Sequence, residues 1–193
     1  MRKFLLPLLA ALTLAACGIN TVPTREEAVK ASWAEVESQY QRRADLIPNL
    51  VATVKGFAAQ EREVLEAVTQ ARASATQTTI NADQLTDPAA VARFQAAQDQ
   101  LSGALSRLLV TVERYPELKS NENFLALQSQ LEGTENRITV ARRDYNQAVQ
   151  AYNTEIRTFP SLIAAKFIYG AEPITPFKAT TAGAETAPTV SFE

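Results

Sequence analysis

Two carboxylates placed one helical turn apart are the residues of this chain best suited to acid–base chemistry. Glu132 and Glu135 lie three positions apart, so on a helix they would share one face. Two such carboxyl groups can act as general acid and general base. The same spacing is common in surface pairs, and no glycine-rich loop, nucleophile elbow or metal-ligand spacing accompanies it. We therefore expect a protein that is not an enzyme and keep a carboxylate-dependent hydrolase or lyase as an alternative.

The composition excludes several other kinds of site. The chain has 193 residues, no histidine and a single cysteine. It therefore lacks the commonest general base and metal ligand, and it cannot form a thiolate cluster. Removal of Arg2 and Lys3 with a signal segment would leave 17 basic against 21 acidic residues, a net charge near −4. The lack of histidine and of a cysteine cluster leads us to expect no metal and no cofactor. Because nothing concentrates basic residues as a phosphate backbone requires, we also expect no nucleic-acid partner.

A first polar group surrounds Pro48, which lies inside an apolar helical pattern. A proline there removes the amide that would bond to the carbonyl of Ala44. The group consists of Arg42, Arg43, Asp45 and Asn49. These residues could form a docking surface for a protein partner. Alternatively, Arg43 satisfies the freed carbonyl while its neighbours are solvated.

A second polar group follows Leu131 on a later helical segment. Its members are Glu132, Glu135, Asn136, Arg137, Arg142, Arg143 and Asp144. If this helix ran parallel to the first and beside it, the two polar groups could meet in an interhelical ion network. Such a network would more readily set the register of the helices than perform catalysis.

The first 16 residues have the layout of a secretory signal peptide. A basic start precedes an apolar run over residues 4–14, which is too short to span a bilayer comfortably. Residues 14–17, Leu-Ala-Ala-Cys, resemble a bacterial lipobox. That resemblance implies cleavage before Cys17, a diacylglycerol on its thiol and an N-acyl chain such as palmitate. An ordinary signal with a coincidental cysteine and an uncleaved anchor remain alternatives.

The rest of the chain is dominated by an apolar repeat of 3.5 residues. Twelve of fourteen seam positions over residues 29–75 are apolar, and the exceptions are Arg43 and Glu61. This spacing is typical of packed helices in bundles and coiled coils. It predicts one long helix over residues 24–75, kinked at Pro48, with a break at the proline as the alternative.

Two further helices are expected, over residues 88–115 and about 122–159. Asp87-Pro88 has the residue types of a helix start, and Tyr115-Pro116 predicts a helix end. Gln98 interrupts the first of these seams, and Thr134 and Glu155 occupy positions in the second. A short apolar helix over residues 161–169 completes an all-α, up-and-down antiparallel four-helix bundle spanning residues 24–170. Residues 17–23 would be a tether to the acylated cysteine, and residues 171–193 a flexible tail.

Three stretches of this chain resemble the LemA family. They are RRADLIPNLVATVKGFAAQE, LLVTVERYPELKSNENFLALQSQLEGTENRITVARRDYN and YNTEIRTFPSLIA, within residues 33–165. The resemblance implies an up-and-down helical bundle with a long first helix on a membrane-attached envelope protein. It also links the chain to envelope stress and membrane metalloproteases and, in separate branches, to magnetosome formation and antigen processing. The chain departs from the family at Gln60, where the family often has histidine.

Together these observations predict a lipid-anchored, non-enzymatic scaffold or adaptor of the bacterial cell envelope. It would bind an unidentified envelope protein through its helices, with affinity helped by confinement of both proteins to one membrane. In a cell with two membranes, Gly18 after the cysteine resembles lipoproteins of the outer membrane that face the periplasm. A self-assembling, membrane-organising protein is the alternative, and the sequence leaves the oligomeric state open.

Overall fold

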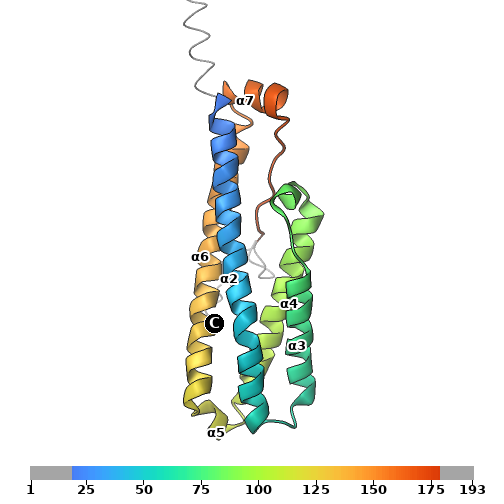
Figure 1. Ribbon diagram of the computed structural model, residues 1–193, viewed down its shortest axis with the longest axis vertical. Coiled ribbons are helices and arrows are strands. Elements are labelled where there is room, and N and C mark those ends of the chain that lie inside the picture. Colours follow the sequence, from blue (N-terminus) through green and yellow to red (C-terminus); the bar gives the residue numbers. More distant parts are fainter. Residues whose placement is uncertain (1–18, 179–193) are drawn as a thin grey trace, which may run out of the picture.

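The computed structural model describes residues 19–178, and this part of the chain is helical without strands (Figure 1). Four long helices run along the molecule in alternating directions: α2 (Thr21–Phe57), α3 (Arg62–Gln77), α4 (Pro88–Val112) and α6 (Glu122–Glu155). Shorter elements connect or follow them: η1 (Ala82–Thr86), α5 (Pro116–Lys119), α7 (Ser161–Ala164) and η2 (Ala165–Tyr169). The predicted all-α bundle is confirmed.

The first predicted helix is in fact two antiparallel helices. α2 continues through Pro48 and ends at Phe57, and the chain then reverses before α3 begins at Arg62. At the reversal Ala58 leaves the helical conformation (φ −133°, ψ 50°) and is fully buried. The prediction of one helix over residues 24–75 is therefore wrong. An apolar repeat records which face of each helix is buried, and it does not record the direction of the chain.

The starts of the other long helices follow local capping rules. The Asp87 carboxylate accepts a hydrogen bond from the Ala89 amide at 2.8 Å, as expected for an N-cap before Pro88. Asn121 accepts from the Phe124 amide at 3.1 Å and caps α6. α2 begins at Thr21, three residues earlier than expected, so Thr24 lies inside the helix and its hydroxyl donates to the Asn20 carbonyl.

The bundle contains two hydrophobic cores arranged end to end. The proximal half, next to residue 19, is built around aromatic side chains of α2, α4 and α6, with Trp33 within 5.3 Å of Phe94 and 5.4 Å of Tyr145 between ring centroids. The distal half is largely aliphatic, and Leu50, Leu101 and Leu108 are fully buried there. Only the distal core includes residues of α3, because that helix is shorter than the others.

Residues 171–178, named here the C-terminal strap, take up the space beside α4 and α6 in the proximal half. Ile174 and Phe177 of the strap are buried in the aromatic core. The Lys178 carbonyl accepts hydrogen bonds from Gln95 of α4 and Arg142 of α6, both at 3.0 Å. A tail beginning at Ala171 was expected, so the packed part of the chain extends further than the sequence predicted. Residues 179–193 of that tail lie outside the described part.

Candidate functional site

Arg43 is the most buried charged residue of the described chain, with 1% of its surface exposed. Its guanidinium donates to Ser102 Oγ and Glu135 Oε1, both at 2.8 Å. It also donates to the Gln98 side-chain oxygen at 2.7 Å and to the Gln98 carbonyl at 3.2 Å. Gln98 in turn donates to the Ala75 carbonyl at 3.2 Å. These contacts join α2, α3, α4 and α6 in one polar layer.

This Arg43 layer, formed by Arg43, Gln98, Ser102 and Glu135, separates the two apolar cores. A buried guanidinium is costly unless it is paired and hydrogen-bonded. Here the Glu135 carboxylate supplies the charge and Gln98 supplies two further acceptors. The Tyr40 ring lies 5.0 Å from the guanidinium carbon and adds a cation–π contact. Polar residues at seam positions fix helix register, because a shifted arrangement would leave the charge unsatisfied.

The structure divides the first predicted polar group. Arg42, Asp45 and Asn49 are exposed on α2, and Asp45 accepts a hydrogen bond from Gln41 at 2.7 Å. Arg43 faces the interior instead, so it cannot belong to a docking surface with its neighbours. Those three exposed residues remain a candidate partner-binding face, since no contact in the structure tests that role.

Arg72, rather than Arg43, satisfies the carbonyl that Pro48 leaves free. Its Nε donates to the Ala44 carbonyl at 2.7 Å. Ala44 is the residue four positions before the proline, so its carbonyl has lost its usual helical donor. The sequence did not point to Arg72, because a single helix over residues 24–75 would have held it far from Ala44. The chain reversal at residues 58–61 brings it there.

The second predicted polar group is also divided. Glu135 meets Arg43 across α6 and α2, although these two helices are antiparallel rather than parallel. Arg142 lies 4.8 Å from the Phe177 ring and holds the strap. The remaining members stay on α6: Arg143 pairs with Asp144 at 3.1 Å, Glu132 accepts from Gln128 at 2.9 Å, and Asn136 and Arg137 are exposed.

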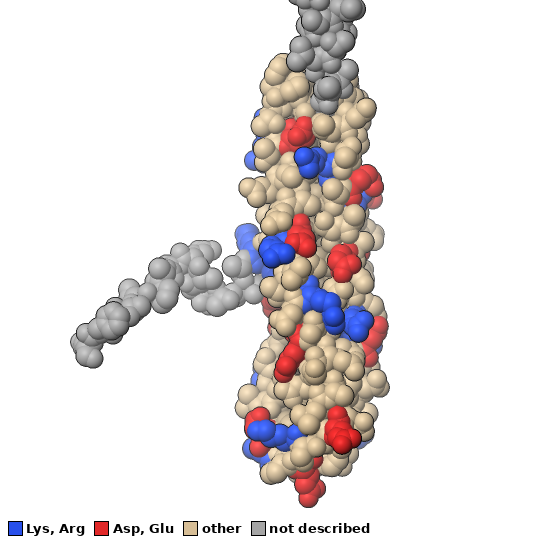
Figure 2. All heavy atoms as spheres, turned by 90° about the vertical axis from the view of Figure 1, so that its left-hand side faces the viewer, with Lys and Arg blue, Asp and Glu red and all other residues tan. Residues whose placement is uncertain are grey.

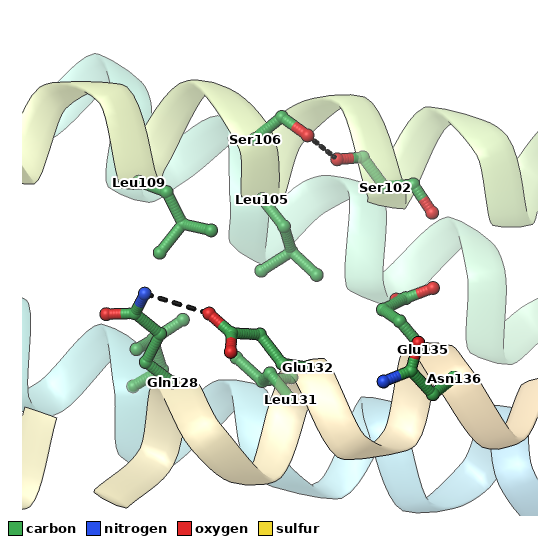
Figure 3. Close-up of a pocket in the computed structure, with 10 residues that line it drawn as sticks. Ser102, Leu105, Ser106, Leu109, Gln128, Leu131, Glu132, Glu135 and Asn136 are labelled. Atoms are coloured by element: carbon green, nitrogen blue, oxygen red, sulfur yellow. Dashed lines mark hydrogen bonds between the residues drawn. The ribbon is translucent and has the colours of Figure 1, made fainter. Parts of the chain in front are cut away.

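A groove of about 500 Å³ opens between α4 and α6 in the distal half, directly beside the Arg43 layer (Figure 3). Apolar side chains form its floor: Leu50, Leu105, Leu109 and Leu131. Polar side chains border it: Ser102, Ser106, Gln128, Glu132, Glu135 and Asn136. Figure 3 shows Leu105 and Leu109 of α4 facing Leu131 of α6 across this α4–α6 groove. An apolar floor with a polar, acidic border is suited to binding.

The two carboxylates at the border of the groove are held by the chain's own donors. Glu135 accepts from the buried Arg43 guanidinium while its side chain remains 46% exposed. Glu132 accepts from the Gln128 amide. Nearby on α4, partial burial raises the pKa of Asp99 above its usual range, although Arg142 and Arg43 oppose that change. The groove is therefore an acidic surface with one carboxylate anchored to the core.

One residue of the site was indicated only indirectly by the sequence, and another gave no signal. Gln98 interrupts the apolar seam of α4, which marks it as a buried polar position. Ser102 is one turn further along the same helix and gave no signal of its own. Their partnership with Arg43 depends on the relative placement of α2 and α4.

Between residues 19 and 178, none of the helices has the length and apolar character needed to cross a bilayer. The same residues contain no group of three or more histidine, cysteine, aspartate or glutamate side chains arranged to hold a metal ion. Cys17, the expected acylation site, lies just outside the described range.

Comparison with known proteins shows one family. The LemA family profile matches residues 32–192. Magnetosome protein MamQ 2 of Paramagnetospirillum magneticum is 27% identical over 157 residues, which cover 73% of this chain and 58% of the relative. Magnetosome protein MamQ of Magnetospirillum gryphiswaldense is 25% identical over 171 residues, covering 80% of this chain and 63% of the relative.

Protein LemA of Metamycoplasma hominis is 23% identical over 124 residues, which cover 64% of this chain and 52% of the relative. The chain thus spans less than two thirds of the length of each of these relatives. The family match covers the bundle from residue 32 onward, including the Arg43 layer and the α4–α6 groove. The chain belongs to the LemA family.

Proposed function

We propose that this chain is a lipid-anchored, non-enzymatic protein of the bacterial envelope that binds a segment of a partner protein in its α4–α6 groove. The observation that carries the proposal is the groove itself. In the proximal half the space beside α4 and α6 is filled by the C-terminal strap, whereas in the distal half it is open. The groove therefore continues a surface on which the bundle already holds a peptide segment.

The strap provides the template for what the groove would bind. Asn146 donates to the Phe177 carbonyl at 3.1 Å and accepts from its amide at 2.9 Å. Asn153 makes the same pair of hydrogen bonds with Ile174, at 2.8 and 2.9 Å. Each asparagine thus satisfies one backbone unit of a non-helical segment while the apolar side chain of that unit enters the core.

The α4–α6 groove offers the same two components. Amide side chains of Gln128 and Asn136 border it, and leucine side chains form its floor. A non-helical segment lying along the groove would find amide partners for its backbone and apolar contacts for alternate side chains. The acidic residues Glu132 and Glu135 favour a lysine or arginine in that segment. We therefore expect an apolar segment of a partner protein that carries at least one basic residue.

The anchor would confine this weak binding surface to the partner's membrane. Confinement raises the effective concentration of two membrane proteins without any additional contact. Replacement of Cys17 by serine should release the full chain from the membrane fraction and abolish incorporation of a radiolabelled fatty acid. Retention of both chains in the membrane, with no acyl label on the wild type, would contradict lipid anchoring.

Site-specific photo-crosslinking tests the groove in cells. A photo-reactive residue replaces Ser106, which borders the groove, and a matched control replaces Gln100, which is exposed on α4 away from the groove. We expect a crosslinked segment with apolar residues and a lysine or arginine from position 106, and none from position 100. Glu132→Lys should reduce the yield several-fold by removing the charge complementarity.

Other outcomes of the same experiment discriminate the alternatives. Crosslinks from position 106 to a second copy of this chain would favour self-assembly, and a segment without basic residues, unaffected by Glu132→Lys, would contradict the proposed recognition. Equal crosslinking from both positions would indicate that the groove has no special role.

A carboxylate-dependent hydrolase remains the second candidate, because a solvent-open groove bordered by Glu132 and Glu135 is the feature it requires. The internal hydrogen bonds of both carboxylates favour binding over acid–base chemistry. Glu132→Gln and Glu135→Gln retain the size of the side chains while removing their charge. Loss of a substrate-consuming activity of the purified chain in both variants would favour the hydrolase.

A further inference from the structure

The proximal end of the bundle carries a cluster of exposed apolar side chains. After α6 the chain forms α7 and η2, and Gly170 (φ 57°) then reverses it into the strap. Six large apolar residues of this excursion are between 41% and 80% exposed: Phe159, Leu162, Ile163, Phe167, Ile168 and Tyr169. We name this cluster the apolar tip. Elsewhere in the described chain, large exposed apolar side chains are scattered over other helices.

α7 and η2, which carry most of the apolar tip, lie at the same end of the bundle as the start of α2 (Figure 1). Thr21, in the first turn of α2, donates to Glu155 Oε1 at 2.7 Å, and Ser161 at the start of α7 donates to the same atom. These hydrogen bonds hold the pKa of Glu155 below its usual range. One carboxylate therefore ties the start of α2, the end of α6 and α7 into one structural unit.

The length of the intervening chain fixes how far the expected anchor can be from this end. Cys17 is four residues before Thr21. Four extended residues reach about 14 Å at most. An acylated Cys17 would therefore bring the apolar tip close to the bilayer surface.

We infer that the apolar tip inserts into the surface of the lipid bilayer, next to the anchor. Its apolar side chains would be removed from water there, and this burial makes a favourable hydrophobic contribution to the free energy of membrane binding. Exposed basic residues Arg157 and Lys166 flank the apolar side chains and suit anionic headgroups. On the face visible in Figure 2, charges of both signs are scattered along the molecule, and the uppermost visible part of that face shows mainly uncharged residues.

Insertion of the tip would also orient the bundle. A flexible tether alone would let the molecule lie at any angle to the membrane. Two attachments at the same end, the acyl chains and the apolar tip, would hold the long axis away from the surface. The α4–α6 groove lies in the distal half and would then be presented at a distance from the bilayer. This inference rests on the proposed anchor and does not depend on the occupant of the groove.

Depth measurements on the full acylated chain in vesicles of phosphatidylethanolamine and phosphatidylglycerol test the inference. Because Cys17 is the only native cysteine and its thiol is the expected acylation site, Phe167→Cys provides a single thiol for a nitroxide label. Val110→Cys is the matched control, since Val110 is 72% exposed and Phe167 78%, and α4 carries Val110 near the distal end. Collision rates with oxygen and with a water-soluble nickel chelate are measured for each label.

We expect the ratio of oxygen to nickel collisions to be several-fold higher at position 167 than at position 110. Phe159→Glu, at an exposed position of the same tip, should lower the ratio at position 167 without unfolding the chain. Equal ratios at the two positions, in a chain that floats with the vesicles and carries acyl label, would contradict insertion of the tip alone. A chain that neither floats nor carries acyl label would contradict the anchor and the tip together.

Discussion

The two halves of the bundle differ in how the space beside α4 and α6 is closed. In the proximal half the strap fills it, so that Trp33, Tyr145 and Phe177 form one aromatic core. In the distal half α3 completes an aliphatic core, and the gap between α4 and α6 remains as a groove. The same bundle therefore holds its own C-terminal strap in one half and has an open groove in the other.

The Arg43 layer marks the boundary between these halves. Tyr40 belongs to the proximal core and Ile47 to the distal core, and Arg43 lies between them on α2. Glu135, the layer's acidic member, also borders the groove. The side chain that pairs with the buried charge of Arg43 therefore also gives the open half part of its acidic character. The structural role of Glu135 and its proposed binding role meet at one residue.

The largest effect on this comparison is expected from Arg43→Ala. The substitution leaves the Gln98 side-chain oxygen without its donor and creates a cavity between the cores, so the free energy of unfolding should fall by about 4 kcal/mol. Urea unfolding of the full chain, followed by circular dichroism, measures it. Arg42→Ala changes the exposed neighbour and should alter stability by less than about 0.5 kcal/mol.

Arg43→Met sharpens the same test. Methionine fills much of the space and would join the two apolar cores, so its loss should be smaller than that of alanine. Equal and negligible losses for all three variants would show that the layer does not separate two packing units. A loss for Arg42→Ala as large as that for Arg43→Ala would show that burial is not the cause.

Phe177→Ala is expected to have the next largest effect, confined to the proximal half. It removes ring contacts with Trp33 and Tyr145, centroids 5.8 and 5.3 Å away, and should lower the free energy of unfolding by about 3 kcal/mol. Hydrogen exchange should increase at the amides of Ile174 and Phe177 and stay unchanged around Leu101. Exchange that increases equally in both halves would contradict their independence.

Arg72→Ala tests the distal half, where α3 supports α2 at the proline. Loss of the donor to the buried Ala44 carbonyl should cost about 1.5 kcal/mol. Pro48→Ala restores a helical amide for that carbonyl, so Arg72→Ala should cost less in the Pro48→Ala chain. A double-mutant cycle measures this coupling. Equal costs in the two backgrounds would show that Arg72 does not compensate for the proline.

The sequence predicted the helix faces because a 3.5-residue repeat requires only local spacing. It also marked Arg43 and Gln98 as interruptions of the seam, which are the two residues at the centre of the buried layer. The reversal at residues 58–61 was missed, since it lacks typical turn residues and the repeat continues across it. The strap was missed for another reason: Asn146 and Asn153 are ordinary polar residues of a helix until the chain folds back onto them.

The smallest of these effects on the free energy of unfolding is expected from Tyr145→Phe. Its dependence on pH tests the proximal half. Burial raises the pKa of Tyr145 above its ordinary value of 10.0, and burial also raises the pKa values of Tyr40 and Tyr152 in the same core. A pKa raised by folding contributes stability that is complete below the unfolded value, about 10, and is lost as the pH rises through the folded value. Alkali should therefore weaken the proximal half.

Tyr145 also donates to the Thr175 carbonyl of the strap at 2.9 Å, so Tyr145→Phe should cost about 1 kcal/mol at pH 7. Above pH 10 the difference from the wild type should shrink, because phenylalanine has no proton to lose. Tyr115→Phe is the comparison at the distal end, where a hydrogen bond to Glu61 is the main cause of the raised tyrosine pKa. Urea unfolding at pH 7 and pH 11 measures both variants. If Tyr145→Phe lost stability between these pH values as steeply as the wild type, the buried tyrosine would not be a source of the alkaline sensitivity.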